Sequence, residues 1–141
     1  CRHPYFARPY PKSTGRELFS LDWLLAQLQG HESPHDVART LVEFSSKTIA
    51  DALVQAASDA DTVYVCGGGI ANPTLMGSLQ QQLAPHGMQW RSTAELQLDP
   101  QWVEAAAFGW LAACWCLQIP GNPHHATGAN RPLILGAGCF A

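Results

Sequence analysis

The sequence predicts an α/β fold in which a mixed sheet is flanked by helices. A short apolar, β-branched run at 62–66 leads into three consecutive glycines and then into Asn72-Pro73, a typical helix start. A second apolar run at 88–92 follows that helix, so the order is strand, helix, strand. The 141 residues are 47% hydrophobic and 13% charged, which is enough length and apolar content to form one packed domain.

The N-terminal segment predicts an extended stretch and then a helix. Prolines recur within residues 1–11 and disfavour a central strand there. Thr14 and Glu17 have the spacing of a capping box, and leucines follow at helical spacing. We therefore expect a helix within 16–29 that ends at Gly30.

The next element is predicted as a long amphipathic helix over roughly 35–58. Ser33-Pro34 supplies an N-cap residue and a proline at the first helical position. Glu43 and Lys47 are expected to pair at i,i+4 on the polar face. Residues 59–61 then form a turn before the first strand.

The strand at 62–66 is expected to be buried, with both faces of its sheet covered, because it is continuously apolar. The helix after it should run from Asn72 to about Leu83. Asp99-Pro100 predicts the start of another helix, over 102–118, which is apolar nearly all round and therefore expected to be central. The run at 132–136 is either a last strand or an extended edge.

Composition excludes several classes of function. A net charge of −3 with scattered basic residues predicts no nucleic-acid surface. No run approaches the about 18 apolar residues of a transmembrane helix, so we expect no membrane partner. Five cysteines, an odd number, disfavour a disulfide framework and favour the reducing cytoplasm, and no ligand spacing indicates a zinc site. Because the chain begins at Cys1, we expect a fragment of a longer protein.

The glycines Gly67, Gly68 and Gly69 are the first candidate site. A dinucleotide fingerprint would need glycine where Asn72 stands, and a Walker loop would need Gly-Lys-Ser/Thr, so neither pattern fits. Glycines have no side chain, so a phosphate can approach their backbone amides closely, and the N-terminus of the following helix favours an anion. A tight turn without any ligand is an equal alternative on these residues alone.

Two further groups of residues are candidates for ligand contact. Glu104 is the only charge in its apolar helix; it either faces a cleft or is a surface partner of the helix dipole. The segment around Gly15 gathers two cations and two hydroxyls that suit a sugar or an oxyanion, namely Lys12, Ser13, Thr14 and Arg16. The alternative for this segment is a capping box with solvated cations.

Three motifs in this order resemble one family. They lie at 11–19 (Pro-Lys-Ser-Thr-Gly-Arg-Glu-Leu-Phe), 65–73 (Val-Cys-Gly-Gly-Gly-Ile-Ala-Asn-Pro) and 102–112, and shorter matches lie at 120–122 and 127–129. They resemble the C-terminal part of anhydro-N-acetylmuramic acid kinase. The resemblance implies a ribonuclease H-like, actin-like ATPase half-domain whose N-terminal lobe is missing from these residues.

The resemblance also implies an activity. Family enzymes open the 1,6-anhydro ring of anhydro-N-acetylmuramic acid with water and phosphorylate O6, using ATP and Mg²⁺, to give N-acetylmuramic acid 6-phosphate for cell-wall recycling. The implied partners are the anhydro-sugar, ATP, the missing N-terminal lobe and, for the full enzyme, a second copy in a homodimer. Less specific alternatives are a non-catalytic nucleotide- or sugar-binding module of this fold and a different sugar kinase.

The resemblance assigns roles to the candidate residues. Gly67, Gly68 and Gly69 would line the nucleotide, with Asn72 beside it at the helix start. Glu104 would hold the sugar, and the segment 12–17 would border the cleft. The family's Gly-Thr-Ser-x-Asp-Gly loop and its water-activating aspartate do not occur here. No catalytic residue or metal ligand is therefore predicted in this chain, and the isolated chain is expected to be inactive.

Overall fold

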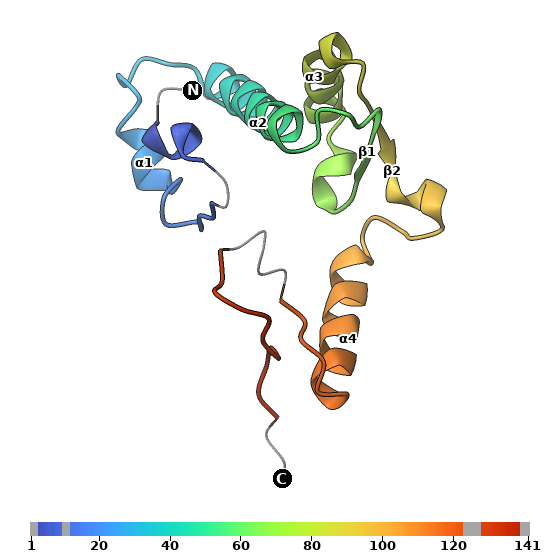
Figure 1. The fold of residues 1–141 in the computed structure, drawn as a ribbon. Helices are drawn as coiled ribbons and strands as arrows, with labels where there is room; N and C mark the ends of the chain where they lie inside the picture. Colours follow the sequence, from blue (N-terminus) through green and yellow to red (C-terminus); the bar gives the residue numbers. More distant parts are fainter. Residues whose placement is uncertain (1–2, 10–11, 123–127, 139–141) are drawn as a thin grey trace. The chain divides into compact units, whose positions relative to one another are not determined.

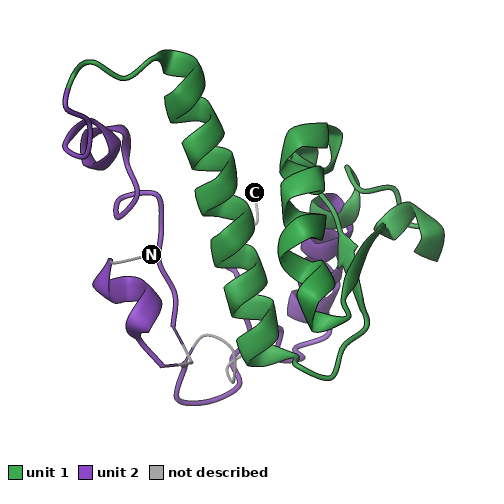
Figure 2. Cartoon of the chain, turned by 90° about the horizontal axis from the view of Figure 1, so that it is seen from above, with its two compact units in different colours: residues 1, 30–104 green, residues 2–29, 105–141 purple. Residues whose placement is uncertain are grey.

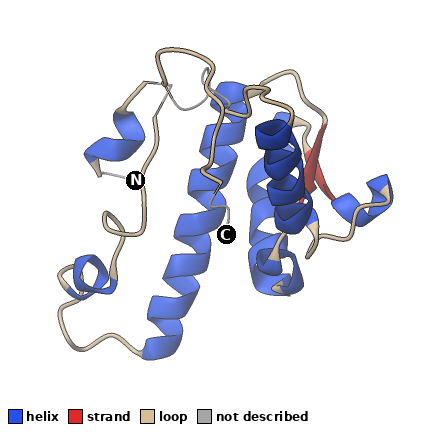
Figure 3. Ribbon diagram, turned by 90° about the horizontal axis from the view of Figure 1, so that it is seen from below, coloured by secondary structure: helices blue, strands red, loops and turns tan. Residues whose placement is uncertain are grey.

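The structure, a computed structural model, describes residues 3–9, 12–122 and 128–138. The chain divides into two compact units, coloured separately in Figure 2. The first comprises residues 30–104, and the second comprises the described parts of 2–29 and 105–141. Helices and a small parallel sheet make up the regular structure (Figure 3), which confirms the α/β class.

The first unit contains α2 (Pro34–Ala56), β1 (Thr62–Val65), α3 (Pro73–Leu83) and β2 (Gln89–Ser92), as labelled in Figure 1. These bounds lie within two residues of the predicted ones. The two strands are parallel, with Thr62 opposite Gln89 and Val65 opposite Ser92. The connection through α3 is the strand–helix–strand unit that the sequence predicts.

Helix α2 begins where the capping residues predict. The hydroxyl of Ser33 accepts a hydrogen bond from the amide of Asp36 at 3.2 Å. The predicted ion pair between Glu43 and Lys47 is wrong. Each residue instead takes a different partner one turn away on α2: Glu43 pairs with Arg39, and Lys47 pairs with Asp51 at 3.0 Å.

The core of the first unit lies between α2, α3 and one face of the sheet. Its buried apolar side chains come from α2, from α3 and from the residue just before β2, namely Ala50, Met76, Leu79, Leu83 and Met88. Val63, Val65 and Trp90 pack against this cluster from the sheet. Tyr64 alternates to the other face and is 43% exposed. The prediction that both faces are covered is therefore wrong for the described residues.

The two outer edges of the sheet differ. The amide of Gln89 donates to the carbonyl of Asp61 at 2.9 Å, and in a parallel pair this turns the peptide groups of Thr62 and Tyr64 away from β2. No partner for those groups occurs among the described residues. On β2, the side chain of Gln80 closes the edge: it donates to the carbonyl of Met88 and accepts from the amide of Trp90, each at 3.3 Å.

The N-terminal part of the second unit departs from the prediction. A 3₁₀ turn at Pro4–Ala7 precedes α1, which spans only Leu21–Leu25. The N-cap is Ser20, whose hydroxyl accepts from the amide of Trp23 at 3.2 Å. The predicted capping box is wrong, because the carboxylate of Glu17 accepts from the amide of Gly15 at 3.0 Å.

Helix α4 (Val103–Cys116) is the least buried long helix. Cys114 is its one buried residue among the described ones, whereas Phe108 and Trp110 are 64% and 58% exposed. The prediction of a central helix is therefore wrong for this chain by itself. The described helices also include none with the length and apolar character needed to cross a membrane.

After α4, the described residues 128–138 contain no strand. The amide of Gly121 donates to the carbonyl of Leu133 at 3.1 Å, and the side-chain oxygen of Asn122 accepts from the amide of Leu133 at 2.6 Å. The extended-edge alternative for 132–136 is thus the better description. The Thr-Gly-Ala motif at 127–129 begins outside the described residues.

Candidate functional site

The glycine loop, residues 67–72, joins the end of β1 to the start of α3. Gly67 has φ 81° and ψ 179°, a backbone conformation open only to glycine. Its amide donates to the carbonyl of Pro100 at 2.8 Å. A 3₁₀ turn over Gly68–Ala71 follows. The loop is therefore fixed at its start to the segment that leads into α4.

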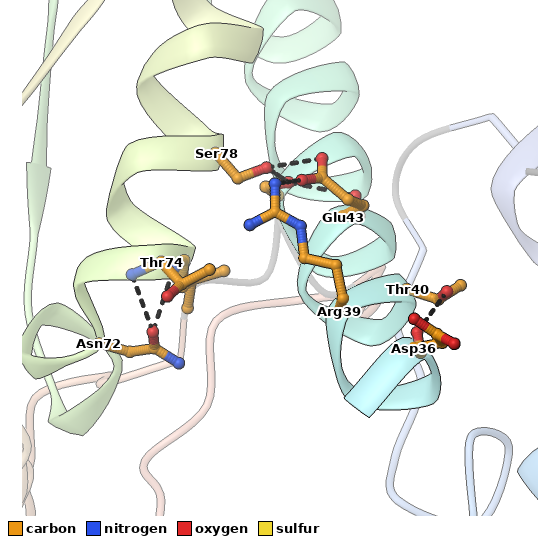
Figure 4. Close-up of polar contacts among 9 residues, drawn as sticks. Asp36, Arg39, Thr40, Glu43, Asn72, Thr74 and Ser78 are labelled. Atoms are coloured by element: carbon orange, nitrogen blue, oxygen red, sulfur yellow. Dashed lines mark hydrogen bonds and ion pairs between the residues drawn. The ribbon is translucent and has the colours of Figure 1, made fainter. Parts of the chain in front are cut away.

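Asn72 ends the loop and caps α3. Its side-chain oxygen accepts from the amides of Thr74 and Leu75, each at 3.1 Å (Figure 4). Pro73 has no amide hydrogen, so the first turn of α3 has few free donors. An anion at this place would therefore accept hydrogen bonds mainly from the loop amides, and not from the helix N-terminus that the sequence suggested.

Gly68 and Gly69 supply those loop amides. Neither amide has a hydrogen-bond partner in the described part of the chain. Neither residue has a positive φ, and a Cβ on Gly68 would meet no atom within 4 Å. A Cβ on Gly69 would make an ordinary contact of 3.6 Å with Leu75. A tight turn thus explains glycine at 67 but not at 68 or 69. This favours the interpretation of the loop as a ligand-binding loop over that of a tight turn without a ligand.

Glu104 lies in the first turn of α4 and is exposed. No described residue pairs with it. The bond from Gly67 to Pro100 brings the loop to the segment just before Glu104. The side chain of Asp99 accepts from the amide of Gln101 at 2.8 Å, so it caps the preceding turn and not α4 itself, a correction to the sequence prediction.

The candidates at 12–16 belong to the second unit. The ammonium of Lys12 donates to the carbonyl of Phe6 at 3.1 Å and lies 5.3 Å from the ring centre of Tyr5. These contacts hold the segment to the N-terminal turn and give Lys12 a structural role. Ser13, Thr14 and Arg16 are exposed, and the hydroxyl of Thr14 donates to the carbonyl of Gly15 at 3.4 Å.

The sequence did not predict an open groove beside the loop. The groove has a volume of about 490 Å³ and is lined by the loop, α3 and β2, including Ile70, Ala71, Pro73, Met76, Gln80 and Trp90. Its lining is mainly apolar. The helical spacing of Pro73, Met76 and Gln80 was visible in the sequence, but their position opposite Trp90 depends on the strand register.

The described residues contain no group of three or more histidine, cysteine, aspartate or glutamate side chains placed to hold a metal. The described cysteines, Cys66, Cys114 and Cys116, are free thiols. The donor atoms that this site offers are therefore backbone amides, which suit a phosphate or another anion.

Comparison with known proteins identifies the family. A sequence profile described as "Anhydro-N-acetylmuramic acid kinase" matches residues 1–141. The chain belongs to the anhydro-N-acetylmuramic acid kinase family. The resemblance drawn from the three motifs is thereby confirmed.

Individual members of the anhydro-N-acetylmuramic acid kinase family match nearly the whole chain. A protein of this name from Neisseria meningitidis is 59% identical over 138 residues, which cover 98% of this chain and 37% of the relative. Relatives from Idiomarina loihiensis and Burkholderia pseudomallei are 54% and 45% identical, covering 96% and 95% of this chain. This chain spans 36–37% of the length of these three relatives.

Proposed function

We propose that this chain forms the nucleotide-binding side of an anhydro-N-acetylmuramic acid kinase. The complete enzyme would hydrolyse the 1,6-anhydro ring and transfer a phosphoryl group from ATP to O6, giving N-acetylmuramic acid 6-phosphate for peptidoglycan recycling in the cytoplasm. The family membership supports this reaction, since the relatives carry the kinase name. Because the chain spans 37% of the first relative, the remaining parts of the site would lie outside these residues.

The observation that carries the proposal concerns Gly68 and Gly69, for which the fold gives no reason to require glycine. Their amides have no partner in the described chain, and the space beside Gly68 is open. A polyphosphate accepts hydrogen bonds from such amides and needs close approach to the backbone. Gly67 makes that approach possible by turning the chain, and Asn72 fixes where the loop ends.

The groove beside the loop offers a place for the base of ATP. It shares Ile70 and Ala71 with the glycine loop, so one ligand can contact both. Apolar lining suits a purine, and none of the described residues that line the groove is acidic. Mg²⁺ would then be held by the phosphates and by carboxylates elsewhere in the complete enzyme, where it would neutralise charge on the transferred group.

Glu104 and the segment around Gly15 are each proposed to bind the sugar. Glu104 is exposed and lies close in sequence to Pro100, which is bonded to the loop. A carboxylate there can accept hydrogen bonds from sugar hydroxyls. For the second unit, the family resemblance leads us to propose sugar contacts by the exposed side chains of Ser13, Thr14 and Arg16, with Lys12 holding the backbone beside them.

The open edge of β1 supports a larger sheet. A two-stranded sheet is marginal by itself, and the outer peptide groups of Thr62 and Tyr64 have no partner among the described residues. Since Gln80 closes the β2 edge, further strands would be added beside β1. This arrangement is consistent with half of a ribonuclease H-like, actin-like fold completed by an N-terminal lobe. We further propose a homodimer for the complete enzyme.

A coupled ADP-release assay tests the function. The full-length enzyme should release ADP only when both ATP and the anhydro-sugar are present, whereas the 141-residue chain should not turn over. Turnover by this chain alone would contradict the placement of the catalytic groups outside it. ATP binding by the full-length protein without turnover would favour the non-catalytic module instead.

Glu104 can be tested in the same assay. Glu104→Ala should raise the KM for the sugar by about tenfold or more, in line with the loss of a hydrogen bond to a charged group, and leave the KM for ATP unchanged. Glu104→Gln keeps one acceptor oxygen and should have a smaller effect. Equal small changes in both KM values would instead assign Glu104 to the helix dipole.

A further inference from the structure

A polar cluster of two buried serines and one partly exposed glutamate joins α2 to α3. We call it the serine–glutamate cluster; it consists of Glu43 and Ser46 on α2 and Ser78 on α3. Ser46 and Ser78 are 0% and 3% exposed, and their hydroxyl oxygens lie 2.7 Å apart. The hydroxyl of Ser78 donates to the carboxylate of Glu43 at 2.7 Å (Figure 4).

The cluster differs from the rest of the contact between these helices. The other buried side chains at this contact are apolar, among them Ala50, Met76 and Leu79. Among the described residues, the cluster makes the only side-chain hydrogen bonds between α2 and α3. Arg39 lies at its solvent side, paired with Glu43. The polar groups are therefore satisfied, so the cluster does not leave an uncompensated buried charge.

Such a cluster restricts the position of α3 along α2. Apolar side chains tolerate small shifts, because dispersion and burial depend weakly on direction. A hydroxyl pair at 2.7 Å that also reaches a carboxylate tolerates little shift, because hydrogen bonds lengthen and bend quickly. The serine–glutamate cluster is therefore suited to hold the register of the two helices, a role that buried polar groups have in some proteins.

The register of α3 determines the position of the glycine loop. Ser78 lies six residues after Asn72, about 9 Å along a rigid helix. Asn72 is tied to the first turn of α3 by two hydrogen bonds, and the loop precedes it directly. A shift of α3 therefore moves Asn72 and the end of the loop, while Gly67 stays bonded to Pro100.

We infer that Glu43, Ser46 and Ser78 are positioning residues for nucleotide binding. They lie away from the loop and act through the register of α3 and the cap at Asn72. The inference rests on the proposed function, since it takes the glycine loop as the ATP contact. A displacement of about 1 Å at such a site is enough to weaken binding or reaction substantially.

The first test is Ser78→Ala in the full-length enzyme. The change leaves no buried hydroxyl without a partner, because Ser46 can direct its one hydroxyl hydrogen to the carbonyl of Glu43, 3.1 Å away. Alanine is also favourable in a helix, so the fold should persist. We expect the KM for ATP to rise roughly three- to tenfold, the loss that one hydrogen bond represents, with the KM for the sugar unchanged.

A second pair of variants separates the hydrogen bond from the charge. Glu43→Gln retains an oxygen that can accept from Ser78 but loses the ion pair with Arg39. It should keep a KM for ATP close to that of the unchanged enzyme, whereas Glu43→Ala should match Ser78→Ala. The double change Ser46→Ala with Ser78→Ala should add little to the single one, because the two hydroxyls share one hydrogen bond.

Lys47→Ala is the matched control, since it removes an exposed ion pair with Asp51 on the same helix and should change neither KM. Amide hydrogen exchange gives a readout without turnover: Ser78→Ala should speed exchange at residues 68–75 and not at the core strands. A lowered melting temperature with unchanged KM for ATP and unchanged exchange would overturn the inference and leave a purely structural cluster. Failure of the proposed function is distinguishable, because then Gly68→Val would also leave ATP binding unchanged.

Discussion

Helices α3 and α4 differ in how many of their residues are buried by the described parts of this chain. Helix α3 buries four residues, Met76, Ser78, Leu79 and Leu83, against elements of its own unit. Helix α4 is far more apolar, yet it buries only Cys114 among the described residues. Burial therefore follows the partners that are present and not the hydrophobicity of the helix.

The difference indicates where the partners of each helix are. Those of α3 lie within these 141 residues, namely α2, β1 and β2. An exposed apolar surface such as that of α4, with Phe108 and Trp110, is typical of an interface. Since the relatives are nearly three times as long as this chain, we propose that α4 packs against the rest of the kinase.

The variant Phe108→Ala in the full-length enzyme has the largest expected effect. If the rest of the kinase covers α4, removing this ring should lower the free energy of unfolding by about 3–5 kcal/mol, the usual cost for a buried phenylalanine. Chemical denaturation followed by fluorescence or circular dichroism measures it. A loss below about 0.5 kcal/mol, typical of a surface position, would show that α4 is exposed in the complete enzyme as well.

The variant Gly67→Ala should have the next largest effect, because alanine is strained at φ 81° and ψ 179°. Residues held in such regions cost about 1–3 kcal/mol each. The matched change Gly68→Ala should cost little, since its Cβ would meet no atom within 4 Å. Equal melting temperatures for the two variants would contradict the loop geometry described above.

A smaller effect is expected for Asn72→Ala, which removes the cap of α3. The amides of Thr74 and Leu75 would lose their acceptor, at a cost of about 1 kcal/mol. Asn72→Ser keeps a capping oxygen and should recover most of the loss. If alanine and serine destabilise equally in thermal unfolding, the side-chain oxygen of Asn72 does not cap the helix.

The sequence predicts most reliably what is decided locally. Asn72-Pro73 marks the start of α3 and Ser33-Pro34 that of α2, because a side-chain acceptor and a missing amide act within one turn. The turn between β1 and α3 was also predictable, because three consecutive glycines follow an apolar run directly. What the sequence could not show is that, of the three loop glycines, Gly67 alone needs to be glycine for the fold, since that depends on φ and on the space around each Cβ.

Several wrong predictions have a common cause, which is competition between alternative partners, some one helical turn away and some distant in sequence. Leucine periodicity favoured a helix over 16–29, but Phe19 instead packs on Phe6 and Trp23, with ring centres 5.4 Å and 5.1 Å apart. Glu43 was assigned to Lys47, but Arg39 and Ser78 take its carboxylate. Spacing alone does not decide between equally spaced partners such as Arg39 and Lys47, and the contact with Ser78 requires the tertiary arrangement.

We propose that position 68 is glycine because the nucleotide approaches its backbone closely, whereas the fold would accept a side chain there. Gly68→Val in the full-length enzyme tests it most directly, by ATP titration calorimetry alongside thermal unfolding. We expect a melting temperature within a few degrees of the unchanged enzyme and a Kd for ATP raised at least about tenfold, which corresponds to about 1.4 kcal/mol. An unchanged Kd for ATP in the folded variant would rule out this contact and leave the loop as a tight turn alone.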